Sequence, residues 1–252
     1  MLDLRLINAE ILKLRRRRGM LAIALLCTVG FATIAFIVTA IQHAGDPTKY
    51  APAGGLKAYR DVLGGLEMLV LIMGTIVGAT AGTQDIESGV FRDLVATGRS
   101  RMALFGARVT GALAVTIPIA ALTALVVGAA SIGLADGTPT PDAGDLVSGS
   151  ALALGAAALA TAVGVGTSAL VGSRGPVIGL LLGFFLAIQP LLLSMSFLGS
   201  TRNVIPGAAL DAVGDMPRYG LDVSAGMGVA VLAAWVAASV GAGAWRTRTR
   251  EI

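Results

Sequence analysis

The sequence predicts an all-α integral membrane protein, folded as a single transmembrane domain over residues 1–252. We expect six transmembrane helices, an N-terminal interfacial amphipathic helix and a cytoplasmic helix between spans two and three. Hydrophobic residues make up 55% of the chain and charged residues only 13%, whereas a soluble domain carries about 25% charged residues. Several apolar runs are long enough to cross ~30 Å of hydrocarbon. Lysine and arginine are also unevenly distributed among the polar segments between these runs.

Residues 1–18 predict an amphipathic helix that lies in the membrane interface. Its apolar face comprises Leu2, Leu6, Ile7, Ile11 and Leu14, and the residues off that face are Asp3, Arg5, Glu10 and Lys13. Four consecutive arginines follow, from Arg15 to Arg18. Such a run can indicate nucleic-acid binding, but an apolar span begins at once, which favours the positive-inside interpretation. We therefore expect a lipid partner here and no nucleic acid.

The apolar runs predict spans at 20–42, 62–82, 109–134, 146–171, 177–198 and 223–245. A cleaved signal peptide is rejected because the first run is too long and further spans follow. Cys27, the only cysteine, cannot form an internal disulfide, and His43, the only histidine, has no nearby partner for a metal site. Residues 204–213 are apolar but too short to span, which predicts a small interfacial or re-entrant helix.

The second span contains a stripe of small residues and one carboxylate. Gly74, Gly78 and Gly82 recur every fourth residue and share one face, where another helix can approach closely. Glu67 is the only carboxylate well inside an apolar run. Because a buried carboxylate is costly in a membrane, it usually faces a bundle interior or a cavity, so Glu67 is a candidate for lining a pathway. The alternative is that Glu67 reaches the interface or pairs with Arg60.

The polar stretch from Thr83 to Arg108 predicts a cytoplasmic helix between the second and third spans. Apolar residues recur at helical spacing from Asp85 to Ala96, and Gly98 would then act as a C-cap. A charged amphipathic helix in this place lies along the membrane or docks a soluble partner, and a solvated loop is the alternative. We favour docking, through Asp85, Glu87, Val90, Phe91, Arg92, Asp93 and Leu94.

The cations predict the orientation of the chain. Six spans place both termini on one side, and that side holds fourteen of the nineteen Lys and Arg residues. These are Arg5, Lys13, Arg15, Arg16, Arg17, Arg18, Arg92, Arg99, Arg101, Arg108, Arg174, Arg246, Arg248 and Arg250. The bias predicts a cell-membrane protein with cytoplasmic termini. We expect Arg15, Arg16, Arg17, Arg18, Arg99, Arg101 and Arg108 to anchor the chain to the inner leaflet.

Motifs for catalysis and nucleotide binding are missing from the sequence. It contains no GxxxxGK[ST], HExxH, CxxC or GxSxG pattern, which argues against an enzyme and against ATP binding by a P-loop in this chain. We therefore expect no catalytic residues and no bound cofactor or metal. Ion-coupled carriers often place several ionisable groups near the midplane. Because Glu67 stands alone, the sequence argues weakly against that class.

The order of these features resembles the type-2 ABC transporter permeases, the integral-membrane subunits of ATP-driven exporters. The resemblance rests on AEILKLRRRRG near the N-terminus and on GTQDIESGVFRDLVATGRSRMALFGAR after the second span. The residues that match the family pattern are Glu87, Ser88–Gly89, Leu94–Val95, Ser100–Arg101 and Arg108.

The resemblance implies that Asp85 to Ala96 is a coupling helix docked on a separate cytosolic P-loop ATPase subunit, which binds ATP and magnesium. It implies that residues 1–18 form an elbow helix and that residues 204–213 help to gate the outer exit. It also implies a dimer, formed with a second copy or a related permease, with spans two and five lining the substrate path between the two permeases.

Two other functions remain open. An ion-coupled secondary transporter would use Glu67 and need no ATPase. A non-transporting membrane scaffold or immunity protein would use the same cytosolic helix to dock a partner. The absence of a clear internal repeat disfavours inverted-repeat carriers.

Overall fold

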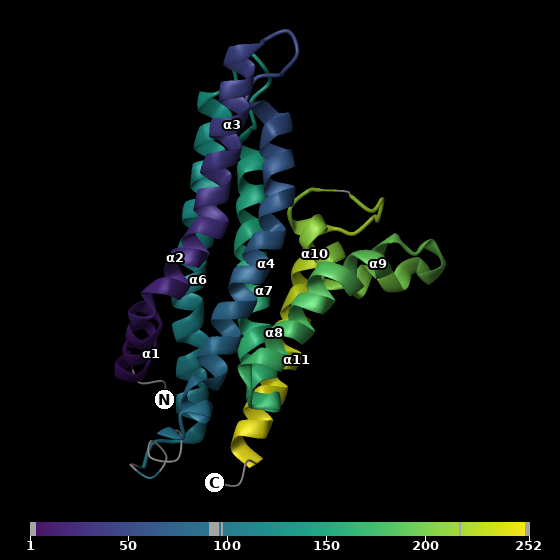
Figure 1. The fold of residues 1–252 in the computed structure, drawn as a ribbon. Helices are drawn as coiled ribbons and strands as arrows, with labels where there is room; N and C mark the ends of the chain where they lie inside the picture. The colour runs from purple at the N-terminus through teal and green to yellow at the C-terminus, as the bar shows by residue number, and fades with distance from the viewer. Residues whose placement is uncertain (1–3, 91–95, 97, 217, 250–252) are drawn as a thin grey trace.

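The computed structural model describes residues 4–90, 96, 98–216 and 218–249, which fold into helices joined by short connections (Figure 1). The α-helices are α1 (Leu4–Arg16), α2 (Arg18–Leu25), α3 (Phe31–Gly45), α4 (Gly55–Glu87), α6 (Arg101–Gly133), α7 (Ala143–Val171), α8 (Arg174–Gly183), α9 (Gln189–Ser194), α10 (Pro206–Val213) and α11 (Ala225–Thr249). Two π-helical turns, η1 (Leu26–Gly30) and η2 (Phe184–Ile188), and the 3₁₀ segment η3 (Ser196–Val204) complete the described elements.

Six helical segments within these ranges are long and apolar enough to cross a membrane, which confirms the predicted number of spans. The protein is therefore a multi-pass membrane protein. The spans are α2–η1–α3, α4, α6, α7, α8–η2–α9 and α11. Helices α4 and α6 have 33 residues each and are therefore about 50 Å long, well beyond ~30 Å of hydrocarbon. The fifth span, Arg174–Ser194, begins and ends before the predicted 177–198, because α8 starts at Arg174 and η3 follows α9.

Local capping residues set several helix ends. The Ser100 hydroxyl accepts a hydrogen bond from the Ala103 amide at 3.1 Å and begins α6. Asp142 and Asp145 form a reciprocal capping box at the start of α7, and Gly172 ends that helix in a left-handed conformation. The capping by Ser100, Asp142 and Asp145 explains why α6 and α7 begin before the apolar runs that the sequence predicted as spans.

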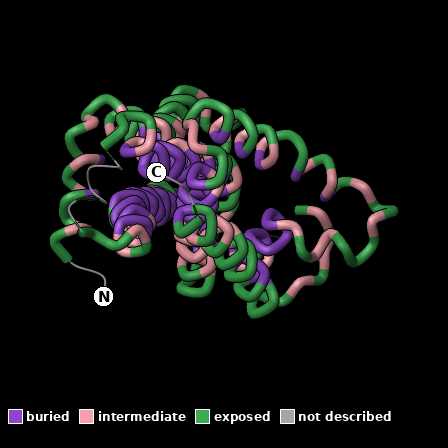
Figure 2. Tube along the Cα trace, turned by 90° about the horizontal axis from the view of Figure 1, so that it is seen from below, coloured by how far each residue is buried: buried purple, intermediate pink, exposed green. Residues whose placement is uncertain are grey.

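Helices α4 and α7 form the centre of the bundle, and α6 and α11 pack against α7. Viewed along the bundle, buried residues gather in these central helices, whereas the part of the chain that projects sideways is largely exposed (Figure 2). That projection comprises the outer part of the fifth span and η3 (Figure 1). Between η3 and α11, the predicted short helix is present as α10, which packs against α11 and α7.

The glycine stripe of α4 lies on its contact with α7. A Cβ atom at Gly74 would come within 2.8 Å of the Ala160 Cβ, and one at Gly78 would overlap the Thr161 carbonyl oxygen. A Cβ at Gly82 would overlap the Ser168 hydroxyl. The two backbones therefore approach more closely than any larger residue would permit.

The exposed apolar surface is concentrated on the outer spans. In α4, 61% of the most apolar stretch is buried, against 22% in the first span and 11% in α11. Large exposed side chains include Ile34, Leu180, Leu191 and Trp235. Such surface in a membrane protein faces lipid or another transmembrane chain.

Gly78→Ala should destabilise the bundle, because the added methyl group would overlap the backbone of α7 rather than a movable side chain. Overpacking of this kind lowers the free energy of unfolding by about 1–3 kcal/mol. The measurement is the thermal midpoint of the solubilised protein, which should fall. Gly64→Ala is the matched control on the same helix, since its Cβ would meet nothing within 4 Å. It should be neutral or stabilising. Equal destabilisation by both changes would contradict the close helix contact.

Candidate functional site

A buried ion network joins three helices at the end of the bundle that holds both termini. The Lys13 ammonium on α1 lies 2.7 Å from the Glu10 carboxylate and 3.0 Å from both Asp85 oxygens on α4. Arg108 Nη2 on α6 donates to Asp85 Oδ2 at 3.1 Å. The side chains of Asp85 and Arg108 are only 6% and 1% exposed. Asp85 therefore connects α1, α4 and α6; we call Glu10, Lys13, Asp85 and Arg108 the inner network.

The N-terminal helix α1 joins the inner network through Glu10 and Lys13. Both residues lie off the apolar face that the sequence predicted for this helix. Glu10 is buried against α6, where Gly111 leaves room for it: a Cβ there would lie 2.7 Å from the Glu10 Cβ. Leu14 is buried beside it, whereas Leu4 and Leu12 are exposed. Burial raises the pKa of Glu10, an effect that the Lys13 ammonium opposes.

Two site predictions are therefore wrong. Asp85 was expected on a docking surface, but its carboxylate is buried between Lys13 and Arg108. Arg108 was expected to contact the inner leaflet, but its side chain lies inside the bundle. A charged residue next to an apolar run is normally predicted to be exposed. It can be buried instead when a residue of opposite charge on another helix pairs with it, as happens here.

Residues 88–100, which we call the 88–100 segment, connect α4 to α6, and the two helix ends that they connect lie at this same end of the bundle (Figure 1). The predicted helix from Asp85 is wrong in its start, because α4 continues through Glu87 and Ser88 follows as its C-cap. Gly89 and Gly98 have positive φ angles of 75° and 84°, and Val90 is exposed. The other predicted docking residues, Phe91, Arg92, Asp93 and Leu94, lie outside the described residues.

Glu87 has a contact that the sequence did not indicate. Its carboxylate accepts a hydrogen bond of 2.7 Å from the Arg174 amide, at the start of α8. The N-terminus of a helix favours negative charge there. The end of the second span is thus joined to the start of the fifth, directly beside the 88–100 segment.

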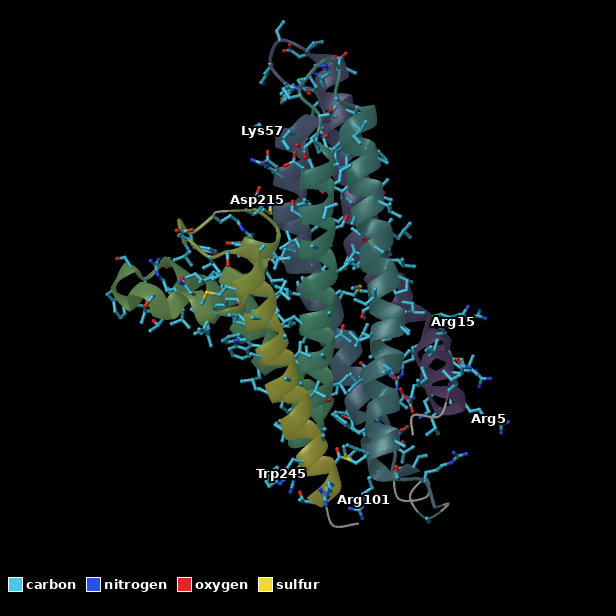
Figure 3. The ribbon with its side chains drawn as sticks, turned by 180° about the vertical axis from the view of Figure 1, so that it is seen from behind. Arg5, Arg15, Lys57, Arg101, Asp215 and Trp245 are labelled. Carbon is cyan, nitrogen blue, oxygen red and sulfur yellow. The ribbon has the colours of Figure 1, made fainter. Side chains whose placement is uncertain are left out.

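The basic residues lie mainly towards this end of the bundle. Figure 3 shows Arg5, Arg15 and Arg101 in the same half as Trp245, with Lys57 and Asp215 in the other half. Arg15, Arg16 and Arg18 are exposed, Arg17 is half-buried, Arg99 is exposed and Arg101 donates to the Arg248 carbonyl oxygen at 3.4 Å. Their contact with lipid remains a prediction.

A second charged cluster lies about 27 Å from the first along α4, since Glu67 precedes Asp85 by eighteen residues. Arg218, in the connection before α11, forms ion pairs with both Glu67 and Asp211 of α10. Its Nε donates to Asp211 Oδ1 at 2.7 Å. The predicted alternative of a Glu67–Arg60 pair is wrong, because Arg60 pairs with Asp145 at 3.1 Å. We call Glu67, Asp211 and Arg218 the outer cluster.

The outer cluster holds two carboxylates and one guanidinium. Glu67 and Asp211 are 6% and 7% exposed. Burial raises the pKa of Asp211 to about 6, and Arg218 opposes this effect. The Asp211 Oδ2 and Gln189 Oε1 atoms are buried, and neither has a hydrogen-bond donor within the described part of the chain. The described residues around the cluster therefore supply too few hydrogen-bond donors for its acceptors, and one guanidinium for two carboxyl groups.

Sequence reasoning identified Glu67 but missed Asp211, Gln189 and Arg218. The only available signal was that a carboxylate in an apolar run needs a cation from elsewhere. Arg218 is 151 residues away from Glu67, so spacing along the chain could not have identified it.

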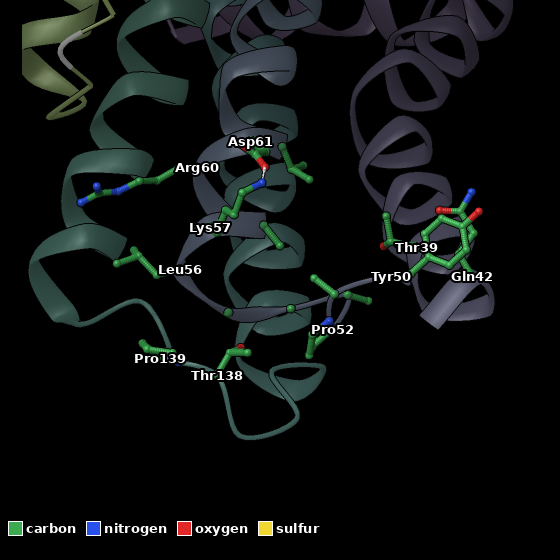
Figure 4. Close-up of a pocket in the computed structure, with 16 residues that line it drawn as sticks. Thr39, Gln42, Tyr50, Pro52, Leu56, Lys57, Arg60, Asp61, Thr138 and Pro139 are labelled. Carbon is green, nitrogen blue, oxygen red and sulfur yellow. Dashed lines mark hydrogen bonds and ion pairs between the residues drawn. The ribbon is translucent and has the colours of Figure 1, made fainter. Parts of the chain in front are cut away.

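A separate cavity of about 740 Å³ lies between the ends of α3 and α4 and the 138–139 connection. Its labelled lining residues include Gln42, Tyr50, Lys57 and Thr138 (Figure 4). Lys57 and Asp61 pair at 2.8 Å with highly exposed side chains, so they gain little from this contact. We assign no chemistry to this cavity.

Asp85→Asn should destabilise the protein strongly, because both Lys13 and Arg108 contact the carboxylate that it removes. Breaking a buried ion pair costs about 3–5 kcal/mol, measured as a fall in the thermal midpoint of the solubilised chain. Asp61→Asn is the matched control on the same helix, because it breaks an exposed pair with Lys57 and should cost less than ~1 kcal/mol. Similar losses from both variants would contradict the inner network.

Acidification should stabilise the folded protein through Asp211. Its folded pKa of about 6 lies above the ordinary 3.8, so the folded state binds the proton first and unfolding becomes less favourable as pH falls through the folded value. As the pH falls from about 7 to about 5, the free energy of unfolding of the native chain should rise, relative to that of Asp211→Asn, by up to ~1.4 kcal/mol per pH unit. Thermal midpoints measure this difference, and parallel pH profiles would contradict it.

Comparison with known protein families found no matching family, and comparison with curated proteins found no match.

Proposed function

We propose that this chain is the permease subunit of an ATP-driven exporter. In this proposal it lies in the cell membrane with both termini in the cytoplasm and docks separate ATP-binding subunits through the 88–100 segment. It forms the substrate path together with a second permease, and the ATP and magnesium are bound by the partner ATPase.

The observation that carries this proposal is the attachment of the 88–100 segment. It connects two helices of 33 residues each, and the inner network ties those helices to each other and to α1. Glu87 further joins the segment to the start of α8. A partner that displaces this segment would therefore move several spans together, as coupling to a cytosolic motor requires.

The charge distribution and the missing motif support the same function. The excess of cations on the side of the 88–100 segment favours a cytoplasmic location for it. The chain carries no P-loop, so the energy of ATP would have to come from another subunit.

The exposed faces of the spans leave room for a second permease. An apolar groove of about 440 Å³ lies between α2, α4 and α8, with Arg17 and Arg174 among its lining residues. A second chain seated over this face would enclose a path lined by the second and fifth spans. Much of the surrounding surface of the first and fifth spans is apolar and exposed.

An ion-coupled carrier is the second candidate, and the outer cluster favours it. Two buried carboxylates share one guanidinium, an arrangement that can bind and release a proton or cation. This candidate requires no ATPase, so a partner-binding experiment separates the two functions.

Exchanging the charges in Arg92→Glu, Asp93→Arg should strongly reduce co-purification of a P-loop ATPase from gently solubilised membranes. The double variant keeps the net charge of the chain but inverts the predicted docking surface, so we expect at least a tenfold loss of the partner, about 1.4 kcal/mol or more. The measurement is the ATPase recovered per permease.

The matched control is Lys57→Asp, Asp61→Lys, which exchanges an exposed ion pair at the other end of α4. It should retain the ATPase. A native chain that is stable yet recovers no ATPase would overturn the exporter proposal and favour the ion-coupled carrier.

A further inference from the structure

The outer cluster borders a pocket whose chemistry is unusual for the interior of an apolar bundle. The pocket has a volume of about 170 Å³ and lies between α4, the η2–α9 turn and α10. Its polar lining residues are Glu67, Gln189, Arg218 and Tyr219, and its apolar walls include Leu71 and Phe185. One end of the pocket is thus polar and the remainder apolar.

The charges around this pocket leave a deficit of one positive charge. Glu67 and Asp211 each pair with Arg218, so two buried carboxyl groups share one guanidinium. Two further carboxylates lie near Arg218, because Asp215 and Asp222 line the adjoining pocket. Asp61 lines the next pocket, but it pairs with Lys57. Arg60, the other nearby cation, is paired with Asp145. A second cation would therefore be stabilised at this site.

The hydrogen-bonding groups show a matching deficit of donors. Gln189 is 4% exposed, lines the pocket, and its Oε1 has no donor among the described residues. Asp211, which also pairs with Arg218, has a buried Oδ2 atom that likewise receives no hydrogen bond from the described residues. Buried acceptors of this kind cost free energy unless a donor reaches them. A ligand that fits must therefore bring N–H or O–H groups as well as positive charge.

The backbone next to Gln189 is irregular. The π-helical turn η2 ends at Ile188, Gln189 follows it directly, and Pro190 comes next. Single π-helical turns within α-helices occur frequently at functional sites. On the other wall, Gly207 gives Gln189 the space it occupies, because a Cβ there would lie 2.6 Å from Gln189 Nε2.

We propose that this pocket binds the primary ammonium group of a small amphiphilic substrate, which donates hydrogen bonds to the Glu67 carboxylate and the Gln189 carbonyl oxygen. The pocket is smaller than the ~300–1,000 Å³ that hold a whole drug-sized ligand. It therefore holds the charged end, and the apolar remainder lies along Leu71 and Phe185. This names a substrate class for the proposed transporter and rests on that function.

Equilibrium binding of radiolabelled 2-phenylethylammonium to the full chain in lipid nanodiscs tests the proposal. The native chain should bind it saturably. The neutral 2-phenylethanol should not compete, because it lacks the charge. The N-trimethylated analogue keeps the charge but has no N–H donor, so it should compete at least ~10-fold more weakly.

Glu67→Gln should weaken binding of the primary ammonium at least ~10-fold, while its amide oxygen can still accept a hydrogen bond from Arg218. Asp136→Asn is the control: it neutralises a carboxylate that is 74% exposed and pairs with His43 instead. Asn also tolerates the positive φ of 42° at this position. This control should bind the probe like the native chain.

Three results would each overturn the ammonium site: non-saturable binding of the probe, competition by 2-phenylethanol as strong as that by unlabelled 2-phenylethylammonium, or unchanged probe binding in Glu67→Gln. The result is separable from the exporter proposal. Failure to bind the probe in a chain that retains its ATPase removes only the pocket assignment, whereas probe binding without any ATPase removes only the exporter.

Discussion

A charge inside an apolar bundle must be paired, and α4 carries a buried carboxylate at each of two levels. Asp85 accepts hydrogen bonds from Lys13 and Arg108, and Glu67 pairs with Arg218. Leaving either carboxylate unpaired would cost several kcal/mol. The partners come from α1, α6 and the connection before α11, so these pairs fix how distant parts of the chain surround α4.

The position of α4 is fixed by apolar packing as well as by charge. Its glycine stripe allows the backbone of α7 to approach closely, and that contact surface runs between the two charged levels. We expect a helix packed along its length in this way to resist bending between its ends, because close-packed interiors transmit strain. The 88–100 segment at one end and the outer cluster farther along are therefore mechanically connected in the proposed transport cycle.

The sequence predicted the number of spans because hydropathy and length are local properties, and α10 lies within the short segment expected at 204–213. Helix α4 contains the predicted span 62–82 but extends beyond it at both ends. It did not predict the roles of Asp85 and Arg108. Their burial depends on Lys13 reaching Asp85 from α1 and on the pairing of Asp85 with Arg108 between α4 and α6, which are tertiary contacts. Glu67 was recognised from its cost in an apolar run, but Arg218 lies in a polar connection where a cation is ordinary. The glycine spacing, by contrast, specified a helix face directly.

The most direct measurement is an interspin distance across the outer cluster in a complex reconstituted with its ATPase. Labels at Lys57→Cys on α4 and Asp215→Cys beside Arg218, in a Cys27→Ser background, report the separation of these two elements. We expect the distance distribution to shift when a non-hydrolysable ATP analogue binds the ATPase, because motion at the 88–100 segment would reach the outer cluster through α4. The same distribution with and without the nucleotide would contradict it.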